Sequence, residues 1–242
     1  IVVACGGDGL QNIVAQQGVE TGGVRSALPF GRGNDFAASL QIRTFKDTEM
    51  AIQKGLIHHA RYVNIEFSDY SRISLTCAGI GLLSEASFRA SRLPFLQGKI
   101  LYTVAALISL MNLKCHKYTL SLDDQKFEKD LLILVGAASE FTGGGIHIAP
   151  DAKSNPDRLN VLFATALGKI AAVKLLIKAL DGKHLAHPNV ENIFHDRCRV
   201  ECETDNFLAS LVYGDGEYMG VLPVSLEIGS KPLRVLVPNA TR

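Results

Sequence analysis

Apolar and polar positions follow two different rhythms in the first sixty residues. Short apolar runs that end at glycines predict buried strands, and longer segments with apolar residues three and four apart predict helices. A strand that is apolar on both faces is typical of a covered parallel sheet, so this part is predicted to be α/β. The predicted elements are strands at 1–4 and 25–29 and helices at 10–17, 34–40 and 47–57, the last capped by Asp47 or Thr48.

From about residue 61 the pattern becomes typical of β structure. We expect an α/β plus β fold: an α/β domain over 1–60 and a mostly antiparallel, β-sandwich-like domain with a few helices over 61–242. The α/β domain is expected to be incomplete, because the chain opens inside an apolar strand with no Met before it. The second domain is predicted to contain strands at 61–67, 72–81, 145–150 and 159–165, helices within 82–113 broken at Pro94, a hairpin about Asp123-Asp124, a helix at 169–180 and four C-terminal strands.

Composition narrows the range of partners. The 242 residues are 47% hydrophobic, enough for a large core, and 25 Lys and Arg balance 24 Asp and Glu, so nothing favours nucleic acid as a partner. The longest apolar run, 100–113, is shorter than the roughly 20 residues that a membrane-spanning helix needs. The cysteines are odd in number and scattered, which predicts reduced thiols in a cytoplasmic protein: Cys5, Cys77, Cys115, Cys198 and Cys202.

The stretch VVACGGDGLQN places a carboxylate, Asp8, among three glycines between a predicted strand and a predicted helix. Backbone N–H groups at such a turn can face a phosphate, because no Cβ blocks the approach. The turn has neither the Lys-Ser/Thr of a P-loop nor the dinucleotide pattern of glycines, so a plain tight turn stays open as an alternative. A carboxylate facing a phosphate is useful if it holds a metal or takes a proton from an attacking hydroxyl.

A second strand–glycine–helix turn follows in LPFGRGNDFAASL. Turns of this kind on adjacent strands place two helix N-termini at one sheet edge, where open α/β sheets bind their ligands. The simpler alternative is that Asn34 caps the helix and Asp35 interacts favourably with its dipole. A further acidic turn, Asp215-Gly216-Glu217 in VYGDGEYMG, fits either a functional pair of carboxylates or an ordinary hairpin bend.

Taken in order, five segments resemble the catalytic domain shared by diacylglycerol kinases, sphingosine kinases and related bacterial lipid kinases. They are GGDG followed by Asn12, LPFGRGNDFA, TGGGIHIAPDA, GKHLAHPNV and DGE. The more distant NAD kinases share only the GGDG turn among these. The resemblance implies an ATP- and Mg²⁺-dependent kinase whose nucleotide and lipid hydroxyl meet between an α/β domain and a β-rich domain. Diacylglycerol is the first expected acceptor and a sphingoid base the second.

The resemblance also implies roles for individual residues. Asp8 is expected to act as the base or to orient Mg²⁺, Glu217 is the other candidate base, and Asp215 is expected to hold the metal or the geometry. Arg92 and Lys99 stand where sphingosine kinases carry phosphate-contacting arginines, although solvated helix charges are an alternative, and Arg32 is a further candidate. The expected nucleotide-binding residues are Gly6, Gly7, Gly9, Asn12, Gly31, Gly33, Asn34, Asp35, Arg92 and Lys99.

Departures from the family pattern keep two other functions open. Ile13 replaces a usual Glu, Ala138 replaces an Asn, and Asn155-Pro156 replaces part of an acidic pair. A catalytically weak nucleotide- or lipid-binding regulatory module is therefore one alternative, and a kinase for a soluble nucleotide such as NAD is another. For the lipid kinase we expect a cytoplasmic protein with transient membrane contact and no spanning segment, and a homodimer is left open.

Overall fold

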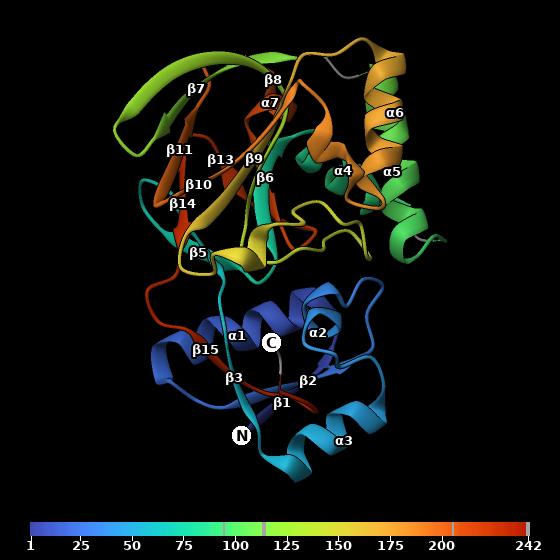
Figure 1. Cartoon of the computed structure of the whole chain (residues 1–242), viewed down its shortest axis with the longest axis vertical. Helices are drawn as coiled ribbons and strands as arrows, with labels where there is room; N and C mark the ends of the chain where they lie inside the picture. The colour runs from blue at the N-terminus through green and yellow to red at the C-terminus, as the bar shows by residue number, and fades with distance from the viewer. Residues whose placement is uncertain (94, 113–114, 205, 241–242) are drawn as a thin grey trace.

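The computed structural model describes residues 1–93, 95–112, 115–204 and 206–240, which form two units along the long axis of the molecule (Figure 1). The first unit is a small sheet between helices, and the second is a large antiparallel sheet with helices on one side. The α/β plus β fold class expected from the sequence is therefore confirmed. None of the helices within these residues has the length and apolar character needed to cross a bilayer.

The first unit is built around a four-stranded sheet in the order β1-β2-β15-β3. Helices α1 and α2 lie on the side that faces the second unit, and α3 lies on the opposite side (Figure 1). Strands β1 and β2 are parallel, with Gly6 opposite Pro29, so both end at the same edge. The elements are β1 (Val2–Gly6), α1 (Asp8–Thr21), β2 (Arg25–Pro29), α2 (Asp35–Ser39), α3 (Phe45–Lys54), β3 (Ile57–Ala60) and β15 (Leu233–Leu236).

The C-terminal strand corrects the predicted division at residue 61. Strand β15 returns to the first unit, where Val235 pairs with Arg25 of β2 and the strand runs antiparallel to β3. Its side chains Leu233 and Val235 join the core of that unit. A short apolar run predicts a strand but does not say which sheet the strand joins. Here β15 pairs with the free edge of β2, and this pairing places it in the first unit. The predicted range 61–242 therefore does not describe one unit at its C-terminal end.

The second unit contains an antiparallel sheet of eleven strands in the described residues, with the order β13-β12-β6-β8-β7-β11-β14-β4-β5 and a branch through β9 and β10. Its strands are β4 (Val63–Glu66), β5 (Ser71–Ser74), β6 (Cys77–Gly81), β7 (His116–Leu122), β8 (Gln125–Ala137), β9 (Leu159–Thr165), β10 (Val190–His195), β11 (Arg197–Glu201), β12 (Leu211–Gly214), β13 (Glu217–Val221) and β14 (Val224–Ile228). Its helices are α4 (Leu82–Ala90), α5 (Gly98–Asn112), α6 (Lys169–Ala179), α7 (Phe207–Ser210) and the 3₁₀ turns η1 (Ala152–Ser154) and η2 (Lys183–Ala186).

Several predicted elements of this unit need correction. Residues 145–150, predicted as a strand, belong to a glycine-rich loop with an isolated bridge between Thr142 and Ile146. The three consecutive glycines 143–145 all have positive φ, which is incompatible with a regular strand. In the part of the chain that the structure describes, six strands follow α6 instead of the predicted four. The predicted helix break at Pro94 lies outside the described residues, as does Leu113; α4 ends at Ala90 and α5 begins at Gly98.

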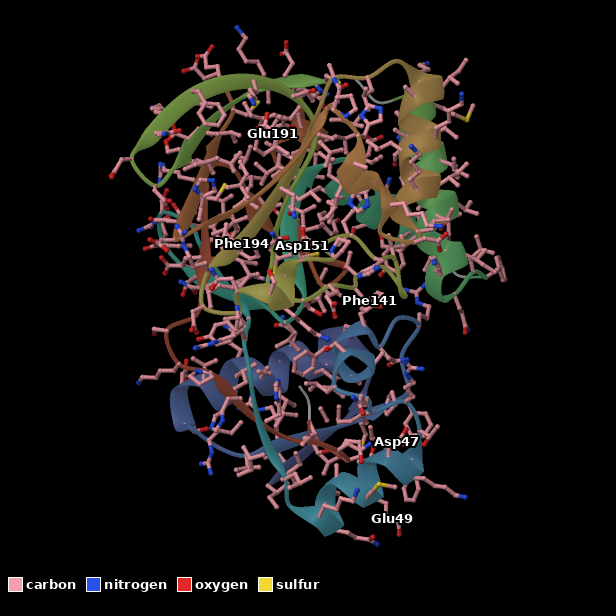
Figure 2. The ribbon with its side chains drawn as sticks, viewed as in Figure 1. Asp47, Glu49, Phe141, Asp151, Glu191 and Phe194 are labelled. Atoms are coloured by element: carbon pink, nitrogen blue, oxygen red, sulfur yellow. The ribbon has the colours of Figure 1, made fainter. Side chains whose placement is uncertain are left out.

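Helix α3 begins earlier than predicted, because Thr44 and not Asp47 is its N-cap. The Thr44 hydroxyl accepts a hydrogen bond from the Asp47 N–H, and the Asp47 carboxylate accepts one from the Thr44 N–H. This reciprocal capping box places Asp47 in the first turn of the helix (Figure 2). The helix ends at Lys54, and Ile57, predicted as helical, begins strand β3.

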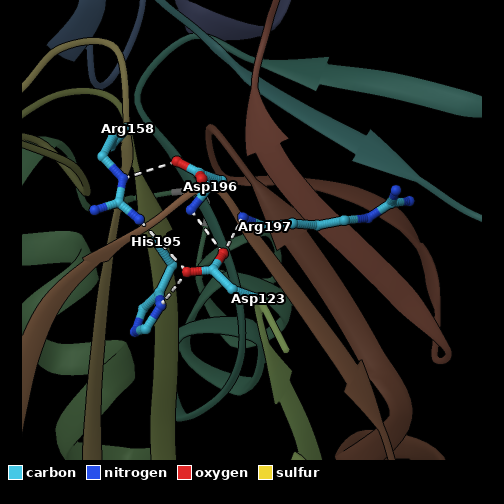
Figure 3. A network of polar contacts seen from close by, with 5 residues as sticks. All are labelled: Asp123, Arg158, His195, Asp196 and Arg197. Carbon is cyan, nitrogen blue, oxygen red and sulfur yellow. Dashed lines mark hydrogen bonds and ion pairs between the residues drawn. The ribbon is translucent and has the colours of Figure 1, made fainter. Parts of the chain in front are cut away.

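The hairpin about Asp123-Asp124 is found as predicted, and its tip is held by a polar network (Figure 3). Asp123 has a positive φ of 50°, and its carboxylate accepts hydrogen bonds from the N–H groups of Asp196 and Arg197. The same carboxylate contacts the His195 ring and the Arg158 guanidinium. Partial desolvation raises the pKa of Asp123, but the hydrogen bonds from His195 and the backbone outweigh this effect, so the net pKa is lowered.

Replacing Asp123 with Asn is expected to destabilise the protein by roughly 1 kcal/mol at neutral pH, because charge-assisted hydrogen bonds are lost. Asn tolerates positive φ, so the turn itself should persist. A depressed carboxyl pKa stabilises the fold above its unfolded value and loses this effect as pH falls through the folded pKa. Urea unfolding from pH 7 down into the acid range should therefore show the two curves converging, and a constant difference between them would contradict this account.

Candidate active site

The two predicted glycine turns meet at the carboxyl ends of β1 and β2. A Cβ on Gly31 would lie 2.1 Å from the Cα of Gly7, and a Cβ on Gly7 would lie 2.8 Å from the Cα of Gly31. Real Cβ atoms do not approach backbone so closely, so both positions need glycine for backbone contact between the turns. The two turns therefore lie together at one edge of the sheet, as expected for consecutive parallel strands.

Replacing Gly31 with Ala is expected to destabilise the fold by roughly 1–3 kcal/mol and to displace the Gly7 backbone, because overpacking here cannot be relieved by a side chain. Gly23→Ala is the matched control: its Cβ would meet only the Thr21 hydroxyl, at 3.3 Å. Urea unfolding of both variants tests the expectation, which fails if Gly31→Ala unfolds with the control.

Asp8 is the first residue of α1, and its carboxylate faces the first backbone N–H groups of α2. Its two carboxylate oxygens accept hydrogen bonds from the N–H groups of Asp35 and Phe36, each at 3.2 Å. Burial, followed by the negative charges of Asp35 and Asp215, raises the pKa of Asp8 to about 7, although the two N–H groups lower it in part. A Cβ on Gly33 would lie 2.6 Å from Asp8 Oδ2, so this glycine makes room for the carboxylate.

Asn34 and Asp35, the next two predicted site residues, form hydrogen bonds with backbone groups of glycine-rich loops. Asn34 does not cap α2 with its side chain; its φ is 65°, and its amide exchanges hydrogen bonds of 2.8 Å with the N–H and the C=O of Gly31. Asp35 is buried and accepts a hydrogen bond of 2.7 Å from the N–H of Gly144. Burial raises the pKa of Asp35, and the N–H groups of Gly144 and Gly145 oppose that rise. Asn34 therefore stabilises the second glycine turn, whereas Asp35 links the start of α2 to the loop at Gly144.

Asp215 joins the DGE turn to both units. Its carboxylate accepts five hydrogen bonds: from the Leu75 and Thr76 N–H groups, from the Ser74 and Thr76 hydroxyls, and from the Asn12 amide, at 2.6–2.9 Å. These donors occupy the lone pairs that a metal would need. The Asn12 amide also donates to the Ile73 C=O at 2.7 Å, which connects α1 to the second unit. The geometry therefore favours positioning roles for Asp215 and Asn12 over contacts with metal or nucleotide.

Two more side chains lie near these carboxylates: Glu217, and Tyr102, which no motif in the sequence singled out. The group is called the carboxylate cluster below and consists of Asp8, Asp35, Tyr102, Asp215 and Glu217. Glu217 is exposed, and its Oε1 lies 3.0 Å from where a Cβ on Gly9 would be. The Tyr102 hydroxyl lies 2.5 Å from where a Cβ on Gly216 would be. Burial, followed by the charges of Asp8 and Asp35, raises the pKa of Tyr102 to about 12, so its hydroxyl stays protonated. The sequence signal for Tyr102 is weak: it is a polar-tipped residue in an otherwise apolar helix, four residues after Gly98.

The two predicted cations on the helices have other contacts. The Lys99 ammonium donates to the Leu180 C=O at 2.7 Å, and the Arg92 guanidinium stacks over the Phe88 ring at 3.9 Å. Arg32 is exposed within the second glycine turn, and its C=O accepts a hydrogen bond of 2.9 Å from the Gly98 N–H, so the turn lies beside the start of the helix that carries Tyr102.

One cavity borders the cluster, and a larger one lies between the two units. One, of about 70 Å³, lies between α4, α5 and the DGE turn; its lining is mostly apolar and includes Leu82, Leu83, Tyr102, Ala106, Leu176, Asp215 and Gly216. The other, of about 710 Å³, lies between the two units on the far side of α2 and is lined by Phe36, Leu40, Leu75 and Lys153 among others. The first cavity is the one whose lining includes cluster residues from the DGE turn.

The donor set does not fit a Mg²⁺ ion held by the protein. Among the described side chains, no group of three or more His, Cys, Asp or Glu residues is placed to hold a metal. Asp215 is saturated with hydrogen bonds, as shown above, and Asp8 accepts N–H groups on both oxygens. In many proteins Mg²⁺ is held mainly by substrate phosphates, with only one or two protein carboxylates as ligands.

Two family models match this chain. Residues 1–65 match the diacylglycerol kinase catalytic domain, and residues 76–237 match the YegS C-terminal NAD kinase beta sandwich-like domain. The chain is 26% identical over 243 residues to a diacylglycerol kinase of Staphylococcus saprophyticus, covering 99% of this chain and 77% of that protein. It is 23% identical to a diacylglycerol kinase of Bacillus subtilis, covering 99% and 78%.

A solved structure of a diacylglycerol kinase from Bacillus anthracis has the same fold, with a TM-score of 0.69 at 15% identity, covering 98% of this chain and 76% of that one. The two family matches include residues of both units and leave residues 66–75, which contain β5, between them. The chain therefore belongs to the kinase family that joins a diacylglycerol kinase catalytic domain to a YegS-type C-terminal β-sandwich-like domain, the family of bacterial lipid kinases.

Proposed function

We propose that this protein transfers the γ-phosphate of ATP to the hydroxyl of diacylglycerol, with Asp8 as the base. The observation that carries the proposal is a carboxylate with a pKa of about 7 at the meeting point of two glycine turns, beside a mostly apolar cavity. Relatives of this chain across nearly its whole length are named diacylglycerol kinases.

Asp8 suits the base role better than Glu217. A base works best when its pKa lies near the working pH, and burial brings Asp8 to that range. In the proposed reaction the acceptor hydroxyl gives its proton to Asp8, its oxygen forms a bond to the γ-phosphorus, and the bond from phosphorus to the leaving oxygen of ADP breaks. Glu217 is the first residue of β13 and is exposed, with its carboxylate near Gly9 in the first turn of α1. In this proposal it would orient the acceptor or the phosphates.

Arg32 and Tyr102 supply the positive field and the hydrogen bonding in this proposal. Phosphoryl transfer depends mainly on positioning and on stabilising negative charge. Arg32 lies in the turn that contacts Gly7, and Gly98 at the start of α5 donates its N–H to the Arg32 C=O at 2.9 Å. Because Tyr102 stays protonated, its hydroxyl can donate to the acceptor or to the transferred phosphoryl group.

The glycine turns are proposed to receive the ATP phosphates, with Mg²⁺ bound to the phosphates and no step assigned to the ion. The N-terminus of α1 offers N–H groups that have no partner within the helix. The corresponding groups of α2 are less available, because Asp35 and Phe36 donate theirs to Asp8. The phosphates should therefore lie nearer to α1 and Arg32 than to α2.

The acceptor's acyl chain is proposed to enter the cavity between α4 and α5. Its polar end is formed by Asp215, Gly216 and Tyr102. Leu82 and Leu176 of its lining also border a second, mostly apolar cavity deeper in the unit. At about 70 Å³ the cavity is narrow, so a full chain must displace side chains of α4 or α5 to enter. An apolar passage that starts at the carboxylates favours a lipid over a soluble nucleotide.

The departures from the family pattern do not remove the groups that this reaction uses. Ile13 is 64% exposed and borders a shallow pocket with Val2 and Gln17, on the outer side of α1 and away from Asp8. Ala138 packs against the core of the second unit. The alternative of an inactive binding module therefore rests on residues outside the carboxylate cluster.

The test is transfer of labelled γ-phosphate from ATP, with Mg²⁺ present, to three acceptors offered separately: diacylglycerol, a sphingoid base and NAD. Label in the diacylglycerol product, lost in Asp8→Asn, is the expected result. Label in the sphingoid base or in NAD would replace the proposed acceptor. ATP binding by calorimetry without transfer to any acceptor would overturn the enzyme and leave the regulatory module.

A further inference from the structure

The larger of the two cavities described above, of about 710 Å³, lies between the two units. Its walls come from α2 and β3 of the first unit, from the connection between β3 and β4, and from segments of the second unit after β5, after β8 and at η1. Small-molecule sites span about 300–1,000 Å³, so this volume is typical of one. In the described part of the chain its lining includes no member of the carboxylate cluster. We call it the interunit cavity.

Basic side chains outnumber acidic ones in this lining. Arg61 forms an ion pair with Asp157, and the Lys153 ammonium lies 2.6 Å from a carboxylate oxygen of Glu140, which is not part of the lining. A guanidinium and an ammonium each carry several N–H donors, so both groups can also donate to a further acceptor. These surroundings favour an anion in the cavity. The charged and titratable residues of the lining are His58, His59, Arg61, Lys153 and Asp157.

Two further polar groups of the lining favour the same kind of ligand. Burial, followed by the positive charges of His59 and Lys153, lowers the pKa of His58, and a negative charge in the cavity would offset that repulsion. Ser139 is 5% exposed, and its hydroxyl has no hydrogen-bond partner among the residues that the structure describes. A buried hydroxyl in this state costs free energy that an acceptor in the cavity would recover.

The rest of the lining is largely apolar and includes Phe36, Leu40, Leu75 and Pro156. An inorganic anion would fill only part of the cavity and leave these side chains in contact with water. A ligand with an apolar or aromatic body and an anionic head fits both parts of the lining. A phosphate monoester carries about two negative charges and several acceptor oxygens, which suits a head surrounded by several basic groups.

The walls of the interunit cavity are bonded directly to the active-site carboxylates. Phe36 lines the cavity with its side chain, and its backbone N–H donates to Asp8 Oδ1 at 3.2 Å. Leu75 lines the cavity from the second unit, and its N–H donates to Asp215 Oδ2 at 2.6 Å. A ligand that holds these two walls at a fixed separation therefore also fixes the donors of both carboxylates.

The cavity also borders a connection between the units. The chain passes between them at 61–62, between β3 and β4, and at 229–232, between β14 and β15. The Gly229 N–H donates to the Tyr62 C=O at 3.0 Å, so the two connections are in contact. Arg61 belongs to the first connection and lines the cavity. An occupant would thus contact both units and one of the connections that join them.

We propose that the interunit cavity binds an organic phosphate with an apolar or aromatic body, and that this ligand acts as an effector of the carboxylate cluster. Bound between the units, it would stabilise the arrangement in which Asp8 and Asp215 keep their donors. Nucleoside monophosphates and phosphatidates share this chemistry. The binding does not depend on the proposed function, whereas the effect on phosphoryl transfer rests on it.

Calorimetry of the whole chain, without ATP or Mg²⁺, tests the site with three probes: inorganic phosphate, AMP and dihexanoyl phosphatidate. At least one organic phosphate should bind about tenfold or more tightly than inorganic phosphate, because its body also buries apolar surface. The organic phosphate that binds more tightly identifies the source. Binding of neither organic phosphate would overturn the inference.

Variants locate the bound probe. His59→Gln/Lys153→Gln should weaken binding by about tenfold or more, because charge-assisted hydrogen bonds to the phosphate are lost. The matched control is His116→Gln/Lys117→Gln on β7, where Lys117 is likewise paired with a glutamate; it should bind as the parent does. Gln41→Glu, which adds a negative charge to the lining at nearly constant volume, should also weaken binding.

Three results with these variants contradict the site. They are equal binding by the cavity variants and the parent, equal losses in the control, and a loss in Arg32→Ser that the cavity variants do not share. The last result would place the probe at the glycine turns instead. Urea unfolding of each variant shows whether a loss of binding follows from a loss of structure, and Gln41→Glu then decides the outcome if the double variant does not fold.

The effector role is measured as kcat for a soluble short-chain diacylglycerol at saturating ATP, with and without AMP or the phosphatidate at its binding concentration. The bound ligand should raise kcat about fivefold or more in the parent and in the control, but not in His59→Gln/Lys153→Gln. Binding with kcat unchanged or lowered would overturn the effector role. Absence of transfer by the parent would contradict the proposed function, and calorimetry would still decide the site.

Discussion

Asp8→Asn is expected to lower kcat for phosphoryl transfer by about 10²–10⁴-fold, because the acceptor hydroxyl loses the group that takes its proton. The amide is almost isosteric with the carboxylate, and its oxygen can still accept one of the two N–H groups that Asp8 receives from α2. Transfer of labelled phosphate at saturating ATP measures the loss. A variant that keeps the parental kcat would exclude Asp8 as the base.

The pH dependence separates a base from a merely structural carboxylate. A base acts in its deprotonated form, so kcat/KM should rise with pH through the raised pKa of Asp8, about 7 in the free protein. Glu217→Gln should lower activity but leave this rising limb in place. If the limb disappears in Glu217→Gln and persists in Asp8→Asn, Glu217 is the base.

The same carboxyl should affect stability in the opposite direction. Its folded pKa is raised above the unfolded value, so the folded state holds the proton more tightly, and stability falls as pH rises from about 4 to about 7. The effect is at most roughly 4 kcal/mol. In Asp8→Asn this part of the pH dependence should vanish, which urea unfolding at several pH values will show.

Asp215→Ala should destabilise the protein by roughly 3 kcal/mol or more, because five donors lose their acceptor together. These donors come from α1, from the end of β5 and from the two residues after it, so the loss also loosens the contact between the two units. The milder Asn12→Ala, which removes the contacts to Asp215 and Ile73, should cost about 1–2 kcal/mol.

Urea unfolding of Asp215→Ala and Asn12→Ala beside Asp69→Ala provides the measurement. Asp69 is exposed in a turn, and its removal should change stability by no more than about 0.5 kcal/mol. An Asp215 variant that unfolds together with the Asp69 control would contradict the positioning role. It would return metal binding as the explanation of this carboxylate.

Local patterns were sufficient where the partners are close in the chain. The two glycine turns follow consecutive parallel strands, so their meeting at one edge follows from connectivity. The hairpin at Asp123-Asp124 joins strands that pair directly with each other. In both cases the contacts lie within about thirty residues, and strand alternation and turn composition predict them.

Other features depend on contacts that no local pattern contains. The Asp215 carboxylate meets Asn12 across 203 positions, and Lys99 reaches Leu180 instead of phosphate. The cap of α3 was misplaced because Thr44, Asp47 and Thr48 all suit an N-cap, and only the backbone geometry selects one.

The class of fold, the family and the acidic and glycine-rich turns can all be predicted from the sequence, because they depend on residue type and short-range spacing. The tertiary structure alone decided that Asp8 is the carboxylate with a pKa near 7, that Tyr102 joins it, and that β15 closes the first sheet. The physical reason is that desolvation, charge proximity and strand pairing arise from segments that folding brings together. A carboxylate's neighbours in the chain do not fix its surroundings in the folded protein.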